Sequence, residues 1–361
     1  MTLVNLPQNV LDPGLVKRVL EELRFKSRKI IGDGGYSEVF SVVEDTIAAK
    51  VVRINRTGKK KSYDFKQVDI QYAGHGQFKE GWRFRDFTGY EMQTLAGTLG
   101  ELFVYQREKE NTELVPYFGS VFVKDPKKNL SHIHLLKQPQ GASLSSFIIP
   151  NKQVPFLLVG EVLTKIIPLY QRWIKEGIVE NDTKPDNIFI EDVNGVPRAY
   201  RVDFGLTKLT KNQIPKKFHT LFFGDSVLLQ REISNLCGTP PYFSKEQTNG
   251  RAVPKTAYWG LGITLAEMVV GSTEDFYQSK TDLELVFEIY SAPGSIKDRV
   301  LQKVSEVPNL PLGLITSIDA LLQHNPEDRD PRPALQLGKI LRAGIHPHSL
   351  MKPIDYRLTP N

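Results

Sequence analysis

The stretch EGIVENDTKPDNIFIED, from Glu176 to Asp192, gathers acids, a lysine and an asparagine in a short polar loop before the chain turns apolar. Asp182 can accept a proton from an attacking hydroxyl group, and Lys184 can neutralise a phosphoryl group in transfer. The amide oxygen of Asn187 suits a hard cation such as Mg²⁺, which prefers oxygen ligands. The alternative for this loop alone is an Asx-rich turn.

A second polar loop follows in YRVDFGLTK, residues 200–208. Asp203 comes directly after an apolar, strand-like run and precedes Phe204 and Gly205. We expect its carboxylate to hold the same metal ion as Asn187. An Asx-rich turn is again the alternative.

Two features near the N-terminus suit phosphate binding. In IGDGGYSEVF (31–40), glycines lie between two strand-like runs, and glycines let backbone amides approach phosphate oxygens closely. In IAAK (47–50), Lys50 lies on the next strand, where it can pair with anionic phosphates. Each feature alone fits a simpler structure, namely a glycine-rich hairpin turn and a solvated lysine.

In order along the chain stand G-x-G-G-x-S-x-V, I-A-A-K, D-x-K-P-x-N, D-F-G and GTPPYFSKEQ. This series, over roughly residues 28–345, resembles the motif set of eukaryotic-type protein kinases. The resemblance implies an α+β, bilobal fold, with a small antiparallel β-sheet N-lobe and a larger, mainly α-helical C-lobe. It also implies transfer of the γ-phosphoryl group of ATP, with Mg²⁺, to a hydroxyl of a protein substrate. Lys184, with Thr239 in CGTPPY, resembles the serine/threonine class.

The resemblance implies a role for each motif residue. Asp182 would be the catalytic base and Lys184 would contact the γ-phosphate. Lys50 would bind the α- and β-phosphates and pair with Glu91, and Mg²⁺ would be held by Asn187 and Asp203. The residues expected around the nucleotide, with 136–141 as the hinge against adenine, are Gly32, Gly34, Gly35, Val39, Ala48, Lys50, Leu136, Lys137, Gly141 and Phe189.

Short β-prone runs between turns predict an antiparallel sheet, and apolar residues at helical spacing predict helices. The strands are expected within 29–53 and at 115–123 and 132–138, and the helices at 14–23, 84–99, 156–177 and 258–271. The predicted divisions are an N-terminal extension with a short helix (1–27), an N-lobe (28–137), a C-lobe (138–346) and a tail (347–361). The polar and basic stretch 55–82 is read as a loop insertion, either solvated or docking an acidic partner at 55–66.

Some positions depart from the family pattern. Glu180-Asn181 replaces the usual His-Arg, and Ala257 replaces an aspartate that supports the catalytic loop. Because Asn181 is uncharged, it cannot ion-pair with a phosphate on the activation segment. The chain therefore resembles a divergent kinase of the non-RD type, which lacks the arginine before the catalytic aspartate. We hypothesise that its activity does not depend on phosphorylation of the activation segment. The hydroxyl residues to test are Thr207, Thr210, Thr220, Ser226 and Ser234.

Two of the departures predict new contacts. Glu180 stands where a histidine normally packs, so we expect its carboxylate to find another partner. Glu246, retained in SKE, is expected to pair with Arg329.

Composition narrows the class. The 361 residues are 40% hydrophobic and 24% charged, as in ordinary soluble proteins, and a net charge of +6 suits an anionic ligand or partner. The single cysteine, Cys237, excludes an internal disulfide and favours a reducing compartment such as the cytoplasm, or a host cell for a viral or effector protein. We expect no secretory signal, no membrane span and no nucleic-acid partner.

Two alternatives stay open beside an active serine/threonine kinase. A pseudokinase that binds nucleotide or acts as a scaffold would fit the changes at Glu180, Asn181 and Ala257. A small-molecule kinase of related fold fits less well, because such enzymes typically lack Lys184-Pro185 and the GTPPY segment.

Overall fold

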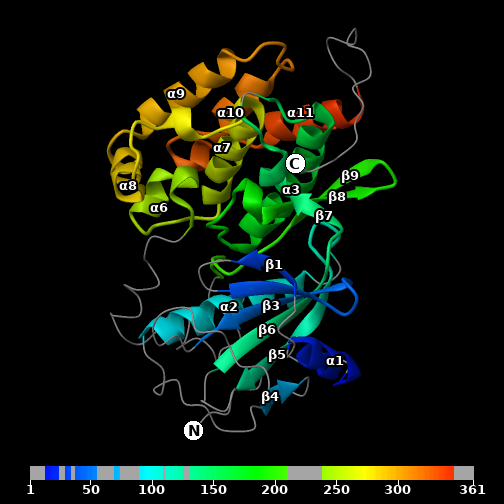
Figure 1. Cartoon of the computed structure of the whole chain (residues 1–361). Helices are drawn as coiled ribbons and strands as arrows, with labels where there is room; N and C mark the ends of the chain where they lie inside the picture. Colours follow the sequence, from blue (N-terminus) through cyan, green and yellow to red (C-terminus); the bar gives the residue numbers. More distant parts are fainter. Residues whose placement is uncertain are drawn as a thin grey trace. The chain divides into compact units, whose positions relative to one another are not determined.

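The computed structural model describes residues 13–23, 29–33, 37–54, 69–73, 89–108, 111–124, 130–150, 152–209 and 238–344. These residues divide into two compact units (Figure 1). The first unit holds the described residues up to Pro139, and the second holds those from Gln140 onward. The basic residues of 55–66, Gly34, Gly35, Cys237 and the predicted tail lie outside the described residues.

The first unit is built on a six-stranded antiparallel sheet of order β1-β2-β3-β6-β5-β4. The predicted strands are confirmed. They are β1 (Lys29–Asp33), β2 (Ser37–Val42), β3 (Ile47–Arg53), β5 (Tyr117–Lys124) and β6 (Leu130–Lys137). The sixth strand, β4 (Asp69–Ala73), was not predicted. The prediction of a loop over 55–82 is wrong in part, because β4 lies within it and pairs with β5. Its sequence, DIQYA, is too short for the alternation of polar and apolar residues to stand out.

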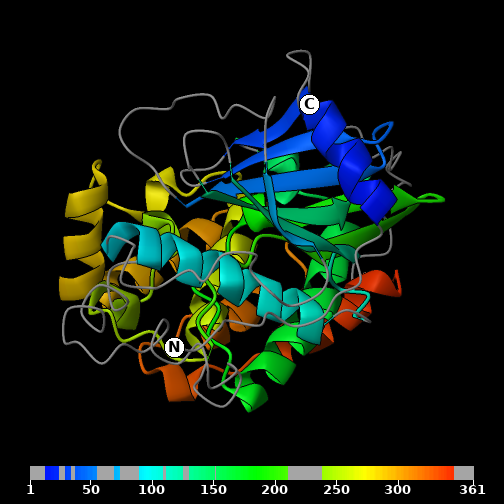
Figure 2. The same cartoon turned by 90° about the horizontal axis from the view of Figure 1, so that it is seen from below.

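Helix α1 (Pro13–Leu23) covers one face of this sheet, as Figure 2 shows. Its apolar residues recur at helical spacing and are almost fully buried. They are Val16, Val19, Leu20 and Leu23. They pack with Ala49 and Val51 of β3, which alternate with Ala48 and Lys50 on the other face. Each such side chain stabilises the unit by roughly 1.5–3 kcal/mol when buried.

Helix α2 (Gly89–Arg107) lies on the opposite face and extends eight residues beyond the predicted end at 99. Thr98 Oγ1 forms hydrogen bonds of 2.8 Å with both His132 Nδ1 and His134 Nε2 of β6. The two histidines share this face because they lie two residues apart on β6, and side chains alternate along a strand. Burial, with Lys50 nearby, lowers the pKa of His132 to about 3, so the ring is neutral.

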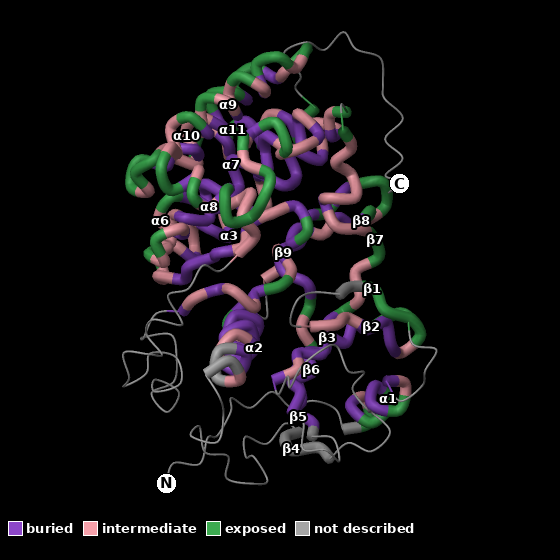
Figure 3. Tube along the Cα trace, turned by 60° about the vertical axis from the view of Figure 1, so that its left-hand side comes forward, coloured by how far each residue is buried: buried purple, intermediate pink, exposed green. Residues whose placement is uncertain are grey.

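The second unit is organised around two buried helices, α3 (Phe156–Glu176) and α7 (Thr256–Val270), visible as buried segments in Figure 3. Both helices were predicted. The surrounding helices are α6 (Lys245–Thr248), α8 (Asp282–Ser291), α9 (Pro293–Ser305), α10 (Leu314–Leu321) and α11 (Arg332–Arg342). Short 3₁₀ turns are η2 (Leu144–Phe147), η3 (Pro185–Asn187), η6 (Pro240–Tyr242), η7 (Glu274–Phe276) and η8 (Pro326–Asp328).

A three-stranded sheet of β7 (Gly141–Ser143), β8 (Ile188–Val193) and β9 (Val196–Arg201) completes the second unit. Asn194 and Gly195 join β8 to β9 with φ of 57° and 80°. These left-handed angles suit a tight hairpin turn, which Asn-Gly favours. The α+β, bilobal architecture predicted from the motifs is therefore confirmed. Among the described helices, none combines the length and apolar character needed to cross a bilayer.

Candidate active site

The loop that carries Asp182 is fixed at both ends within the second unit. Helix α3 ends at Gly177, whose φ of 76° is the left-handed conformation that glycine adopts at helix ends. The backbone of Val179 then pairs with that of Lys208 through hydrogen bonds of 2.9 and 2.8 Å. Turn η3 and strand β8 follow, so the loop lies between two rigid elements.

The carboxylate of Asp182 is held by three side chains. Asn187 Nδ2 donates to Asp182 Oδ2 at 2.7 Å and to the Asp182 carbonyl oxygen at 2.8 Å. Thr239 Oγ1 donates to Asp182 Oδ1 at 2.8 Å, and Lys184 Nζ lies 3.2 Å from Oδ2. Lys184 Nζ also donates to Thr239 Oγ1 at 2.6 Å. Residues of the predicted D-x-K-P-x-N and GTPPY motifs thus form one network.

Asp203 lies beside this network. Val202 N donates to the carbonyl oxygen of Asn187 at 3.0 Å, which joins the two predicted loops. Asp203 is exposed and has a φ of 60°, and its Oδ1 accepts a hydrogen bond from Gly205 N at 3.1 Å. Phe204, next in the chain, is fully buried and meets the ring of Trp173 edge-on at 5.5 Å.

The donor set of this loop pair fits a hard divalent cation. Both amide hydrogens of Asn187 are directed to Asp182, so the amide oxygen is the atom of this side chain that could bind a metal ion. Asp203 contributes a solvent-facing carboxylate. An amide oxygen and a carboxylate, completed by water and phosphate oxygens, are typical ligands for Mg²⁺.

Glu180 has a new partner, as expected, and that partner is Arg201. Its Oε1 accepts from Arg201 Nη2 and from the backbone N of Asp182, both at 2.8 Å. Its Oε2 accepts from Thr207 Oγ1 at 2.9 Å. The bond to Asp182 N supports the catalytic loop backbone, which the missing aspartate at Ala257 was expected to leave without a partner.

Asn181 also takes a structural role. Its side chain is buried, and Nδ2 donates to the carbonyl oxygen of Leu206 at 2.9 Å. Its own carbonyl oxygen accepts from Gln247 Nε2 at 2.8 Å. Further along, Arg329 Nη2 donates to Glu246 Oε2 at 2.9 Å, which confirms the predicted pair.

The last residue of the motif GTPPY, Tyr242, contacts a carboxyl group with a shifted pKa, that of Glu267. Tyr242 OH donates to Glu267 Oε2 at 2.7 Å. Burial, with a smaller contribution from the charge of Asp186, raises the pKa of Glu267 to about 7.

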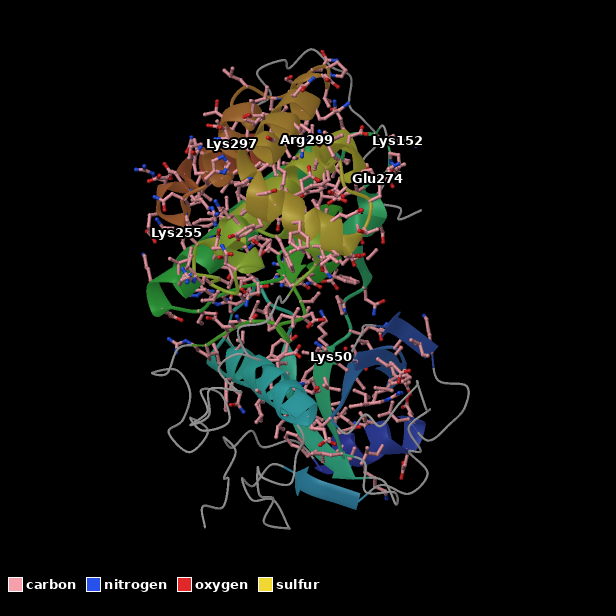
Figure 4. All side chains as sticks on the ribbon, turned by 90° about the vertical axis from the view of Figure 1, so that its left-hand side faces the viewer. Lys50, Lys152, Lys255, Glu274, Lys297 and Arg299 are labelled. Carbon is pink, nitrogen blue, oxygen red and sulfur yellow. The ribbon has the colours of Figure 1, made fainter. Side chains whose placement is uncertain are left out.

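In the first unit, Lys50 is buried on β3 and its side chain points toward α2 (Figure 4). Its Nζ lies 2.8 Å from both carboxylate oxygens of Glu101. The predicted pairing of Lys50 with Glu91 is therefore wrong. Glu91 lies near the start of α2, ten residues before Glu101, which is about 15 Å along a helix axis. The insertion before α2 hid this shift from sequence reasoning.

The other predicted nucleotide-binding residues lie partly in each unit. In the first unit, Ala48 and Leu136 face each other on neighbouring strands, as do Val39 and Lys50. Gly32 lies on β1, and Lys137 is exposed at the end of β6.

In the second unit, Gly141 of β7 passes so close to β8 that a Cβ atom would lie 1.9 Å from the carbonyl oxygen of Ile190. Phe189, half-buried on β8, lies opposite Ser143. Among these residues, Gly141 is the one whose identity the backbone itself requires.

Sequence reasoning missed Glu101 and Arg201. Glu101 was concealed within an apolar stretch of α2. Arg201 did leave a signal, because a cation within the apolar run before Asp203 needs a buried partner, and Glu180 was a carboxylate in the preceding loop without an assigned role.

Comparison with known proteins agrees with this geometry. A model of the protein kinase domain matches residues 127–335, more than half of the chain. The chain therefore belongs to the protein kinase family, as its motifs indicated.

Several of its curated relatives carry the name serine/threonine-protein kinase. A "Probable serine/threonine-protein kinase" of Dictyostelium discoideum is 28% identical over 68% of this chain and 47% of its own length. The "Probable serine/threonine-protein kinase PknB" of Corynebacterium glutamicum is 24% identical over 69% of this chain and 31% of its own. "Serine/threonine-protein kinase C" of Synechocystis is 31% identical over 34% of this chain and 20% of its own. The matches thus span between a fifth and a half of these relatives.

Proposed function

We propose that this chain is a serine/threonine protein kinase that transfers the γ-phosphoryl group of ATP to a protein hydroxyl, with Mg²⁺ as its metal. The observation that carries the proposal is the fixed Asp182 carboxylate, bound by Asn187, Lys184 and Thr239. A pseudokinase would have no need to hold these four groups in this arrangement. The single cysteine supports a reducing compartment such as the cytoplasm.

The residues divide the chemistry between them. Asp182 orients the substrate hydroxyl and takes its proton, and Lys184 neutralises negative charge on the phosphoryl group. Thr239 holds both side chains through its one hydroxyl. Lys50, oriented by Glu101, binds the α- and β-phosphates. Asn187 and Asp203 would hold Mg²⁺, which neutralises charge on the phosphates when bound.

The test is phosphoryl transfer from labelled ATP to a generic protein acceptor by the purified full chain. We expect Asp182→Asn to lower kcat by roughly 10²- to 10⁴-fold, as expected for loss of a general base. Lys152→Gln, which changes an exposed residue, serves as the control. Equal transfer by wild type and Asp182→Asn would contradict the proposal. Label on a metabolite but on no protein would instead support a small-molecule kinase.

We further propose that activity does not depend on phosphorylation of the activation segment. The supporting observation is Asn181, which is buried and bonded to Leu206 where an arginine would await a phosphate. Thr207 is buried and donates to Glu180, so its hydroxyl belongs to the folded structure and must not be removed in the test.

The combined alanine variant therefore changes the remaining candidates, Thr210, Thr220, Ser226 and Ser234. We expect this variant, and phosphatase-treated wild type, to keep activity within about twofold of untreated wild type. Loss of activity in the folded variant, recovered by aspartate at one of these positions, would refute phosphorylation independence.

A further inference from the structure

Arg201, at the end of β9, has a guanidinium group completely removed from solvent. Taking such a charge out of water is costly unless a counter-charge and hydrogen bonds replace the lost hydration. The guanidinium group of arginine keeps its proton in proteins, and the Glu180 carboxylate, 2.8 Å from Nη2, supplies the counter-charge. Arg201 is therefore a permanent buried cation.

The guanidinium group contacts both predicted loops, the one that carries Asp182 and Asn187 and the one that carries Asp203. Nη1 donates to the carbonyl oxygen of Asn187 at 2.9 Å, and Nη2 donates to that of Asp182 at 3.2 Å. Nη1 also donates to the carbonyl oxygen of Val202, and the group lies 5.5 Å from the ring centre of Phe204. One side chain thus holds the backbone on both sides of the expected metal site.

Glu180 extends this arrangement in the other direction. Its carboxylate, 2% exposed, binds Arg201 with one oxygen and Thr207 with the other. Thr207 follows Asp203 in the chain, so the ion pair connects the segment before Asp182 to the segments on either side of Asp203. Asp203 itself adopts a left-handed φ of 60°, which costs energy for a residue with a side chain and needs such support.

We propose that Glu180 and Arg201 form a positioning pair that sets the relative placement of Asp182, Asn187 and Asp203. In this kinase the buried ion pair provides internally the charge contact that an activation-segment phosphate would otherwise provide. The inference rests on the proposed kinase activity and adds two residues to it. Neither residue touches the substrate; both act through the backbone that they hold.

The decisive variant replaces both charges by apolar side chains of similar size, Glu180→Leu with Arg201→Met. Such replacements of buried ion pairs often keep or raise stability, because no charge is left without a partner. The double variant should therefore fold. A displacement of catalytic groups by about 1 Å can cost about 100-fold in rate, so we expect kcat to fall by about 100-fold with the KM for ATP little changed.

Arg201→Lys supplies the conservative comparison, because lysine keeps the charge opposite Glu180 but cannot fork between two carbonyl oxygens. We expect the kcat of Arg201→Lys to lie between that of the double variant and that of wild type. The matched control is Arg299→Lys (Figure 4), since Arg299 also binds a carboxylate, Glu288, and a backbone carbonyl oxygen, that of Phe276, but away from the catalytic loop. It should lower stability and leave kcat unchanged.

Amide hydrogen exchange gives a second readout. In the double variant, residues 181–187 and 202–207 should exchange faster while α7 keeps its protection. A folded double variant with kcat within twofold of wild type and unchanged exchange would overturn the positioning role alone. A wild type without any transfer to protein would overturn the proposed function as well, so the two failures are distinguishable.

Discussion

Glu101→Gln should weaken the first unit, and Glu91→Gln should not. Lys50 Nζ lies 2.8 Å from both carboxylate oxygens of Glu101, whose side chain is 1% exposed. At an effective dielectric constant of 20, opposite unit charges at this distance attract by roughly 6 kcal/mol. Glutamine keeps the volume but removes that counter-charge from a buried ammonium group. After partial recovery through hydrogen bonding, we expect the free energy of unfolding to fall by about 3 kcal/mol.

The assay has to follow the first unit. Two of the three tryptophans, Trp173 and Trp259, belong to the second unit, so tryptophan fluorescence would not report on the first unit alone. Amide hydrogen exchange in β3 and β6 measures the opening of the first unit directly. Glu91→Gln, on the same helix and partly exposed, is the matched control and should change the opening free energy by less than about 0.5 kcal/mol.

The same two variants should separate in activity. Glu101→Gln releases Lys50 from its fixed orientation and should lower kcat, whereas Glu91→Gln should keep it. If Glu91→Gln speeds exchange in β3 as much as Glu101→Gln does, or if Glu101→Gln changes neither exchange nor kcat, the assignment of Glu101 as the partner of Lys50 is refuted.

Three further variants test other contacts. Val19→Asp places a charge in the α1 core and should cost about 3 kcal/mol, seen as faster exchange in β3; unchanged exchange would contradict that packing. Gly260→Ala would bring a Cβ atom within 2.8 Å of the carbonyl oxygen of Thr183 and displace the loop that carries Asp182, so kcat should fall in transfer assays. Full activity would show that this loop tolerates the displacement. The pKa of Glu267 is raised from its ordinary value of 4.5 to about 7, so stability should fall as pH rises from about 4.5 to about 7. Thermal unfolding of Glu267→Gln should lose this dependence, and an unchanged pH profile would exclude Glu267 as its source.

The parts of the fold that the sequence predicted were those with strong local signals. The strands around Lys50 and the helix 156–177 have clear apolar periodicity, and the structure has them close to the predicted bounds. Strand β4 was missed because it gains its stability from pairing with β5, a contact that local sequence does not record.

The candidate site divides in the same way. Asp182, Lys184, Asn187 and Asp203 were predicted because they lie in short motifs of fixed spacing. The structure joins the first three in one network, and the backbone bond from Val202 to Asn187 holds the loop of Asp203 beside it. The partner of Lys50 was predicted wrongly, because it depends on how far α2 is shifted by the insertion before it.

The ion pair of Glu180 and Arg201 could be recognised only in the structure, for a related reason. Glu180 departs from the usual family pattern, and neither a buried carboxylate nor a buried guanidinium group is favourable without the other. A carboxylate in the catalytic loop and a cation in an apolar strand become compatible only when their contact, 2.8 Å in the structure, is known.

Helix α1 has a practical consequence for recombinant work. The match to the kinase domain model starts at residue 127, and the recognisable motifs start near Lys29, so a trimmed expression clone would naturally omit α1. Such a truncation would expose a continuous hydrophobic surface on the sheet, where Ala49, Val51 and their neighbours now pack against the helix. Aggregation of the truncated protein would then result from the removal of α1. Proteins that keep the residues from Pro13 onward should aggregate less.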